Sequence, residues 1–151
     1  MSQHGAMKVE LRNEIHGGLP PHDDHPYRSG VWRPQYREYD AWDLDVEGEI
    51  PDDLAGVYLR NTETAVFEPA KRYHPFDGDG MIHSIGFANG EATYANRFVR
   101  TEGFLAEQEA GRSLWAGITE HPSNAEADHG WGARSMMKDN ASTDVIVHRG
   151  E

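Results

Sequence analysis

The 151-residue chain contains no cysteine, which excludes disulfide bonds and thiolate metal ligands. Basic residues are also scarce, since 14 Lys and Arg stand against 26 Asp and Glu and give a formal net charge of −12. A charge of this sign argues against nucleic-acid binding and against a polybasic membrane anchor. The sequence has no transmembrane run of about eighteen apolar residues, and its first residues lack the apolar stretch of a signal peptide. We therefore expect a cytoplasmic location.

The most distinctive part of the sequence is the stretch 72–83, which reads Arg-Tyr-His-Pro-Phe-Asp-Gly-Asp-Gly-Met-Ile-His. Pro75 fixes its own φ and favours extended backbone at His74, because the proline ring restricts the residue before it. Gly78 and Gly80 permit positive φ at two further positions. The pattern predicts a tight turn that leads into an apolar strand.

Three interpretations of this turn compete. A calcium loop that began at Asp77 would need an oxygen ligand at its fifth position, where the chain has Met81. His74 and His83 could form a metal-binding pair, because imidazole is a common ligand. In the third interpretation Asp77 and Asp79 accept backbone N–H groups inside the turn, and both histidines are hydrogen-bonded structural residues. The residue chemistry favours this third, structural interpretation.

Alternating apolar residues predict a β-meander after the turn. The first strand is expected at 81–87, the residues 88–91 contain the Asn-Gly pair typical of two-residue hairpins, and a second strand is expected at 94–100. Shorter strands are predicted at 56–60 and 144–148, and residues 102–111 predict one or two helical turns. Short strands joined by Gly- and Pro-rich turns indicate an all-β sandwich, barrel or propeller.

Several tracts follow one another with a characteristic order and spacing. They are Gly48-Glu-Ile-Pro-Asp-Asp-Leu54, Gly56-Val-Tyr-Leu-Arg-Asn61, His74-Pro-Phe-Asp-Gly-Asp-Gly-Met-Ile-His83 and Tyr94-Ala-Asn-Arg-Phe-Val-Arg-Thr101. Together they resemble the opening part of the carotenoid cleavage oxygenases, a family that includes lignostilbene dioxygenases and the retinal pigment epithelium isomerase. The resemblance extends from about residue 26 to residue 151. One departure is Arg60-Asn-Thr-Glu-Thr-Ala65, where many members have Arg-Asn-Gly-Pro-Asn-Pro, and it bears on the substrate subclass.

The resemblance implies an all-β fold, namely the N-terminal part of a seven-bladed β-propeller that holds a non-heme Fe(II) through four histidines. Seven blades of four strands need on the order of 28 strands, and at the usual spacing roughly 220 to 340 residues. The 151 residues would therefore supply about two blades, truncated at the C-terminus. We expect a disordered, extended polar leader at 1–25 and the propeller segment at 26–151.

The resemblance also places all four iron ligands downstream of the strand that holds His148. We therefore expect no metal-binding, catalytic or cofactor-binding residue in this chain. None of its nine histidines is expected to be a ligand: His4, His16, His22, His25, His74, His83, His121, His129 and His148. Four aromatic residues are candidates for a substrate tunnel, although core packing is the commoner role of such side chains: Phe67, Tyr94, Phe98 and Phe104.

The function implied by the resemblance is oxidative cleavage of a C=C bond by a non-heme Fe(II) dioxygenase. Its substrates would be O₂ and an apolar polyene or stilbene, that is, a carotenoid, apocarotenoid or stilbene-type molecule. Peripheral membrane contact would be compatible with the full-length protein, whereas the 151 residues alone are expected to be inactive. The alternative function is a non-catalytic β-propeller fragment or interaction module.

Overall fold

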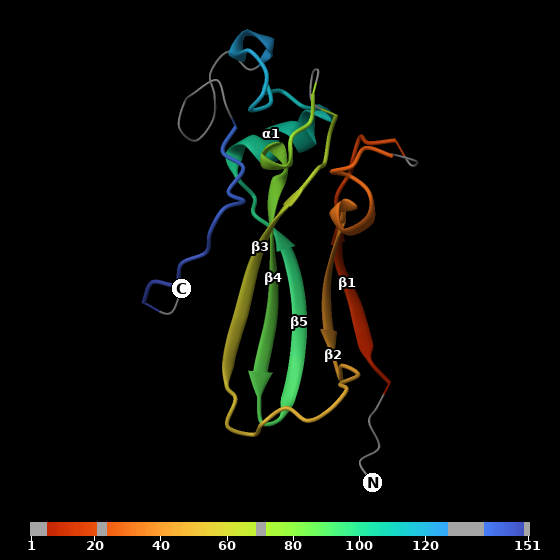
Figure 1. Cartoon of the computed structure of the whole chain (residues 1–151), viewed down its shortest axis with the longest axis vertical. Coiled ribbons are helices and arrows are strands. Elements are labelled where there is room, and N and C mark those ends of the chain that lie inside the picture. Colours follow the sequence, from red (N-terminus) through yellow and green to blue (C-terminus); the bar gives the residue numbers. More distant parts are fainter. Residues whose placement is uncertain (1–5, 21–23, 69–71, 127–137, 150–151) are drawn as a thin grey trace.

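The computed structural model describes residues 6–20, 24–68, 72–126 and 138–149. Five strands form one antiparallel sheet in the order β1-β2-β5-β4-β3 (Figure 1). The strands are β1 (Lys8–Glu14), β2 (Arg37–Trp42), β3 (Gly56–Thr64), β4 (Asp79–Ala88) and β5 (Glu91–Phe98). The described residues are thus mainly β, as predicted, and the sheet is open. It contains one strand more than the four of a single propeller blade.

The helices are few and short. The single α-helix among the described residues, α1 (Glu102–Ala110), follows β5 and lies at one end of the sheet (Figure 1). Thr101 caps its N-terminus, with a hydroxyl that accepts the N–H of Phe104 at 3.1 Å, and Gly111, which has φ 68°, caps its C-terminus. The described residues also form three 3-10 helices: η1 (Gly30–Trp32), η2 (Pro75–Asp77) and η3 (Pro122–Asn124). No helix in the described ranges is long and apolar enough to cross a membrane.

The meander β3–β4–β5 follows the alternation predicted from the sequence. β3 pairs with β4 from Gly56 opposite Phe87 to Thr64 opposite Asp79, so both strands are longer than expected. The reversal between β4 and β5 uses Asn89 and Gly90, whose φ values of 53° and 74° suit a type I′ turn. The predicted hairpin and the predicted helix are therefore confirmed.

The core lies where the meander meets α1. Met81 is fully buried, and the rings of Phe98 and Phe104 stack with their centroids 5.2 Å apart. The core cluster consists of Val66, Phe67, Met81, Phe98 and Phe104. Ile15, the residue after β1, packs against this cluster. Three of the four tunnel candidates thus lie in the core, where burial and packing explain their presence.

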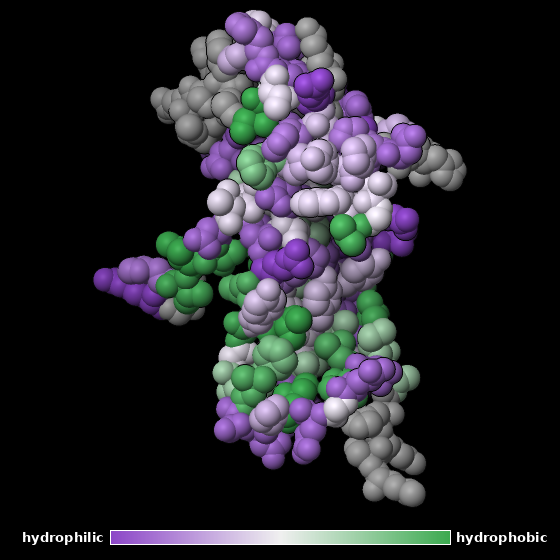
Figure 2. All heavy atoms as spheres, viewed as in Figure 1, coloured by the Kyte–Doolittle hydropathy of each residue, from purple (hydrophilic) through white to green (hydrophobic). Residues whose placement is uncertain are grey.

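Exposed apolar side chains gather at the opposite end of the sheet, whereas the end around α1 is mostly polar (Figure 2). Leu54 lies in the connection before β3, and Val57 lies in β3 itself; they are 43% and 65% exposed. The described part of the chain therefore has one end with a closed core and one end with uncovered apolar residues.

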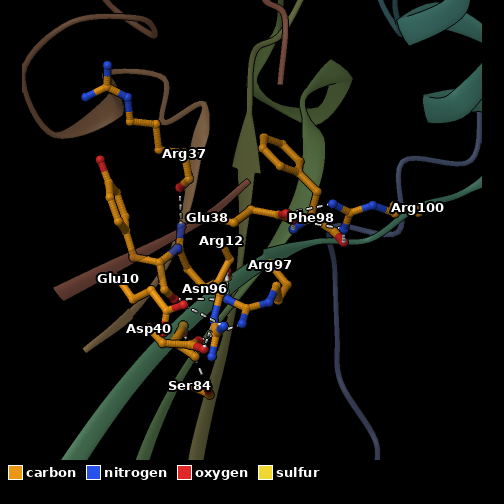
Figure 3. A network of polar contacts seen from close by, with 12 residues as sticks. Glu10, Arg12, Arg37, Glu38, Asp40, Ser84, Asn96, Arg97, Phe98 and Arg100 are labelled. Carbon is orange, nitrogen blue, oxygen red and sulfur yellow. Dashed lines mark hydrogen bonds and ion pairs between the residues drawn. The ribbon is translucent and has the colours of Figure 1, made fainter. Parts of the chain in front are cut away.

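β2 joins the meander largely through side chains (Figure 3). The described register between β2 and β5 consists of Asp40 opposite Ala95 and Ala41 opposite Tyr94. Beyond these pairs the side chain of Asn96, and not the backbone of β5, makes the hydrogen bonds to the backbone of β2. Its Oδ1 accepts the N–H of Tyr39 at 2.7 Å, and its Nδ2 donates to the carbonyl of Arg37 at 2.8 Å. A buried amide therefore continues the ladder where the two strands diverge.

We call this contact between β2 and β5 the seam, and Glu38 continues it toward the end of β5. Its Oε1 accepts the backbone N–H of Phe98 at 2.7 Å, and its two carboxylate oxygens accept the guanidinium of Arg100 at 2.9 and 2.6 Å (Figure 3). Glu38 and Asn96 are each 1% exposed. Since buried polar groups are costly unless they are paired, these contacts specify how the N-terminal hairpin attaches to the meander.

The predicted disorder of residues 1–25 is wrong for β1. These seven residues are all exposed, yet they pair with β2 from Lys8 opposite Trp42 to Glu14 opposite Arg37. Ion pairs link the two strands, including Arg37 to Glu14 at 2.9 Å. Val9 and Leu11, which alternate with charged residues, are 54% and 51% exposed, so pairing with the backbone of β2, and not burial, holds this edge strand. Residues 1–5 and 21–23 lie outside the described residues.

The strand predicted at 144–148 is also wrong. This segment has no ladder partner among the described residues, and Ile146 and Val147 are 82% and 68% exposed. In Figure 1 it leaves the α1 end of the molecule beside β3 without joining the sheet. β-Branched residues favour a strand, but a strand forms only where a neighbour can pair with its backbone.

Removal of the Asn96 amide tests the seam. Asn96→Ala should lower the free energy of unfolding by about 2 kcal/mol, because it leaves buried backbone groups of β2 unpaired. Urea unfolding measures the change. Asn124→Ala is the matched control, since the Asn124 amide makes a long contact of 3.4 Å to Glu120, and it should change stability by less than about 0.5 kcal/mol. Equal losses in both variants would contradict the role of Asn96.

Acidification tests Glu38. Burial raises the pKa of the Glu38 carboxyl, but hydrogen bonds from Arg100, the N–H of Phe98 and Asn13 outweigh burial and leave the pKa below its usual value. A carboxyl of this kind stabilises the fold above its unfolded pKa of about 4.3 and loses this effect as the pH falls through the folded pKa. We expect Glu38→Gln to flatten the loss of stability between neutral pH and about pH 3. Urea unfolding at each pH measures the free energy of unfolding of the unchanged protein and of Glu38→Gln. An equal dependence on pH in both proteins would refute this role.

Candidate functional site

The turn before β4 is the first of two candidate sites. The Nδ1 of His74 accepts the N–H of Phe76 at 3.2 Å, and Asp77 Oδ2 accepts the N–H of His74 at 2.9 Å, so the two residues form a capping box at the N-terminus of η2. Asp77 Oδ1 accepts the N–H of Ile118 at 2.6 Å. The structural interpretation of His74 and Asp77 is therefore confirmed, and Asp77 also fastens a segment that lies 41 residues away in the sequence.

Asp79 has a different partner from the one predicted. Its carboxylate lies 2.8 Å from the Nζ of Lys138, which also contacts Glu107 of α1 at 2.6 Å. All three side chains are almost fully buried. Burial raises the pKa of Asp79, whereas Asp79 and Glu107 together outweigh the effect of burial on Lys138 and raise its pKa. Lys138 therefore remains a cation between two carboxylates.

The two glycines of the turn permit close approach of other backbone segments. A Cβ atom at Gly78 would lie 2.8 Å from the backbone nitrogen of Thr64, and one at Gly80 would lie 2.2 Å from the carbonyl oxygen of Ala141. The N–H of Gly80 donates to the carbonyl of Asn140 at 2.8 Å. Neither glycine has positive φ, so that expectation is wrong. What these positions require is the absence of a side chain.

We call residues 74–80, with the segments that contact them, the junction. It joins the end of β3, the helix α1, the loop at 115–118 and the segment 138–141. A small cavity of about 50 Å³ beside the junction is lined by residues that include Phe67, Phe76 and Trp115. A cavity of this size holds a few water molecules and no polyene.

His83 belongs to the second candidate site, on the face of the meander. Its Nδ1 lies 2.8 Å from the hydroxyl of Tyr94, and its Nε2 lies 3.2 Å from the hydroxyl of Thr62. Burial, together with the positive charge of Arg60, lowers the pKa of His83. His83 is therefore a neutral, hydrogen-bonded residue, and the structural interpretation is confirmed.

A groove of about 500 Å³ lies over this face of the sheet. Tyr94, the fourth tunnel candidate, is half-buried and lines it together with His83. The rest of the lining comes from β3, from Ile85 of β4 and from residues within 31–35, which lie in η1 and after it. Of the four aromatic candidates, Tyr94 is thus the one that lies beside an open space large enough for a small molecule.

The described residues do not fit an iron site. No three of their His, Asp and Glu side chains are placed to hold a metal ion, and the ring nitrogens of His83 are already paired. His121 is a capping residue of η3, while His16 and His148 are exposed. His25 stacks edge-on with Tyr73. His4, His22 and His129 lie outside the described residues.

Comparison with known proteins agrees with the fold and the motif. A family model described as retinal pigment epithelial membrane protein matches residues 32–151. The chain belongs to this family, the carotenoid cleavage oxygenases. The match includes the junction turn, β3, β4 and β5, so the tracts noted in the sequence lie in the part of the chain that the family shares.

Two relatives illustrate the range of the family. Lignostilbene-alpha,beta-dioxygenase isozyme III of Sphingomonas paucimobilis is 36% identical over 126 residues, which are 82% of this chain and 24% of the relative. Apocarotenoid-15,15′-oxygenase of Synechocystis is 41% identical over 90 residues, which are 58% of this chain and 18% of the relative. The chain thus spans a quarter or less of the length of these relatives.

Solved structures show the same relationship. The crystal structure of Pseudomonas brassicacearum lignostilbene dioxygenase matches with a TM-score of 0.72 and 28% identity, over 87% of this chain and 27% of that chain. A cobalt-substituted Synechocystis apocarotenoid oxygenase matches with a TM-score of 0.50 and 42% identity, over 56% of this chain and 18% of that chain. The cobalt indicates a metal site in that relative, and the family is metal-dependent.

Substitution at Gly80 tests the junction. Gly80→Ala should destabilise the protein by about 1 to 3 kcal/mol, because its new methyl group overlaps the carbonyl of Ala141 and the backbone must move. The matched control in the same strand is Gly86→Ala, whose methyl group meets the movable hydroxyl of Thr93. Urea unfolding and hydrogen exchange at 138–141 measure the effect. If both variants behaved alike, close approach at Gly80 would not be the constraint.

Proposed function

We propose that this chain forms part of a non-heme Fe(II) dioxygenase that cleaves a C=C bond of a carotenoid, apocarotenoid or stilbene-type substrate. The single observation that carries the proposal is the family match over residues 32–151. The relatives named above are an apocarotenoid oxygenase and a lignostilbene dioxygenase, so the reaction class is common to both. The proposed activity is that of a protein as long as these relatives, and the residues of this chain correspond to part of that length.

The longer alignments with relatives named for aryl alkenes support substrates of that class. The lignostilbene dioxygenase aligns with 82% of this chain, and an isoeugenol monooxygenase of Pseudomonas nitroreducens aligns at 32% identity with 83%. The apocarotenoid oxygenase aligns with 58%. The altered tract at 60–65 lies at the end of β3, next to the junction. We therefore propose a stilbene-type substrate ahead of a polyene.

The part played by this chain is structural and positional. The junction holds α1 and the segment 138–141 against the start of β4, and the seam attaches β1 and β2 to the meander. Because the described residues do not fit a metal site, we place the Fe(II) ligands outside them, and no step of the reaction is assigned to their side chains.

Metal loading tests this division of roles. The purified 151-residue chain, incubated anaerobically with Fe(II) and passed through a desalting column, should retain far less than one iron per chain. Elemental analysis measures the ratio. One tightly held Fe(II) per chain, together with oxygen-dependent loss of a stilbene absorbance band, would place the metal site within these residues and refute the assignment.

A chimera tests the substrate class. Residues 26–151 replace the aligned segment of the Sphingomonas lignostilbene dioxygenase, and the parent enzyme is the control. The chimera should bind iron and cleave a hydroxystilbene, which loss of absorbance in air measures. Cleavage of an apocarotenoid, and not of the hydroxystilbene, would contradict the stilbene-type substrate and indicate a polyene. A folded, iron-loaded chimera that cleaves neither would favour the non-catalytic module.

A further inference from the structure

The small cavity beside the junction has polar groups in its lining. They include the side chains of Asp79, Glu107, Trp115, Lys138 and Asn140. The volume of the cavity is about 50 Å³, whereas one water molecule needs roughly 10 to 15 Å³. Cavities with apolar walls stay dry, and cavities with unpaired polar groups bind water. The hydrogen bonds of these side chains therefore decide what the cavity holds.

Trp115 contributes a buried donor. Its indole N–H has no hydrogen-bond partner within the described part of the chain, and Trp115 is only 3% exposed. The residue begins the loop at 115–118, which Asp77 fastens through the N–H of Ile118. A buried donor without a partner costs about 1 to 3 kcal/mol, and the N–H of a buried tryptophan usually finds an acceptor. The protein groups that the structure describes do not supply this acceptor.

Two acceptor atoms belong to the same lining. Asn140 Oδ1 is buried and accepts no hydrogen bond from the described residues, while its Nδ2 donates to the carbonyl of Phe76, which fixes the orientation of the amide. Asp79 Oδ1 lies 2.8 Å from the Nζ of Lys138 as an ion pair, but this contact is not a well-aligned hydrogen bond. The lining thus has one donor and two acceptors to satisfy.

The charged groups of the cavity are already engaged with one another. Lys138 lies between Asp79 and Glu107, and both oxygens of Glu107 accept hydrogen bonds. The two carboxylate oxygens of Asp77 each accept a backbone N–H. A cation could not accept the indole N–H, and an anion could not donate to the amide oxygen of Asn140. Water can do both, so the remaining groups select a small neutral molecule.

We propose that this cavity is a binding site for internal water, which accepts the indole N–H of Trp115 and donates to Asn140 Oδ1 and Asp79 Oδ1. Internal waters make about three hydrogen bonds. The three groups lie in the loop at 115–118, in the segment 138–141 and at the start of β4, so the water bridges three parts of the junction. The proposal does not depend on the proposed cleavage reaction.

NMR of the isotope-labelled chain tests the site without a substitution. Long-lived bound water gives NOE and ROE cross-peaks of opposite sign to a nearby proton, whereas exchange with solvent gives cross-peaks of the same sign. We expect opposite signs at the indole proton of Trp115. Trp32, which is 45% exposed, is the control and should show no long-lived water. Cross-peaks of the same sign at Trp115, or none, would overturn the proposal.

Oxygen-17 relaxation dispersion provides a second measurement, because it detects the oxygen of long-lived water and is insensitive to protons relayed through hydroxyl or ammonium groups. Trp115→Phe removes the donor and keeps an aromatic ring, so the dispersion should lose the amplitude of about one water molecule. Trp32→Phe is the matched control and should change nothing. Circular dichroism checks that both variants fold, and the NOE result decides if Trp115→Phe does not. Equal amplitudes in the unchanged protein and in folded Trp115→Phe would contradict the site.

Discussion

The approach of residues 138–141 to the backbone of Gly80 is the constraint on which the rest of this structure depends. It brings Lys138 between Asp79 and Glu107, and it places α1 over the core. The three charges are almost fully buried, so each is tolerated only in the presence of the others; breaking a buried pair of this kind typically costs about 3 to 5 kcal/mol. Gly80 therefore matters because it has no side chain to obstruct residues 138–141. Lys138 matters because its charge neutralises Asp79 and Glu107.

The seam between β2 and β5 solves a related problem with neutral and charged side chains. Two strands that diverge would leave backbone groups unpaired in a buried place, and Asn96 and Glu38 supply the missing partners. The five-stranded sheet is thus a continuous meander to which an N-terminal hairpin is attached by specific polar contacts. Junction and seam pair four carboxylates of this acidic chain with basic groups: Asp40 with Arg97, Glu38 with Arg100, and Asp79 and Glu107 with Lys138.

The junction and the seam bear on function because they build a scaffold. The chain shares its fold and its motif with a family of metal-dependent oxygenases, yet its described side chains form a scaffold and a groove, and no metal site is found among them. The core takes up most of the aromatic residues that seemed suited to a substrate, whereas Tyr94 lies in the groove. Membership of the family and the chemistry of this particular segment are therefore separate conclusions.

Local sequence determined what depends on neighbours in the chain. Alternation and the Asn-Gly pair identified the meander and its hairpin, the residues after Thr101 indicated the helix, and the tract at 76–81 identified the family. Tertiary structure decided what depends on distant partners. The partner of Asp79 lies 59 residues away and that of Glu38 lies 62 residues away, and no periodicity connects them. For the same reason β1 forms although all of its residues are exposed, since β2 pairs with its backbone. The apolar segment 144–148 forms no strand, since no neighbour in the described chain completes its backbone hydrogen bonds.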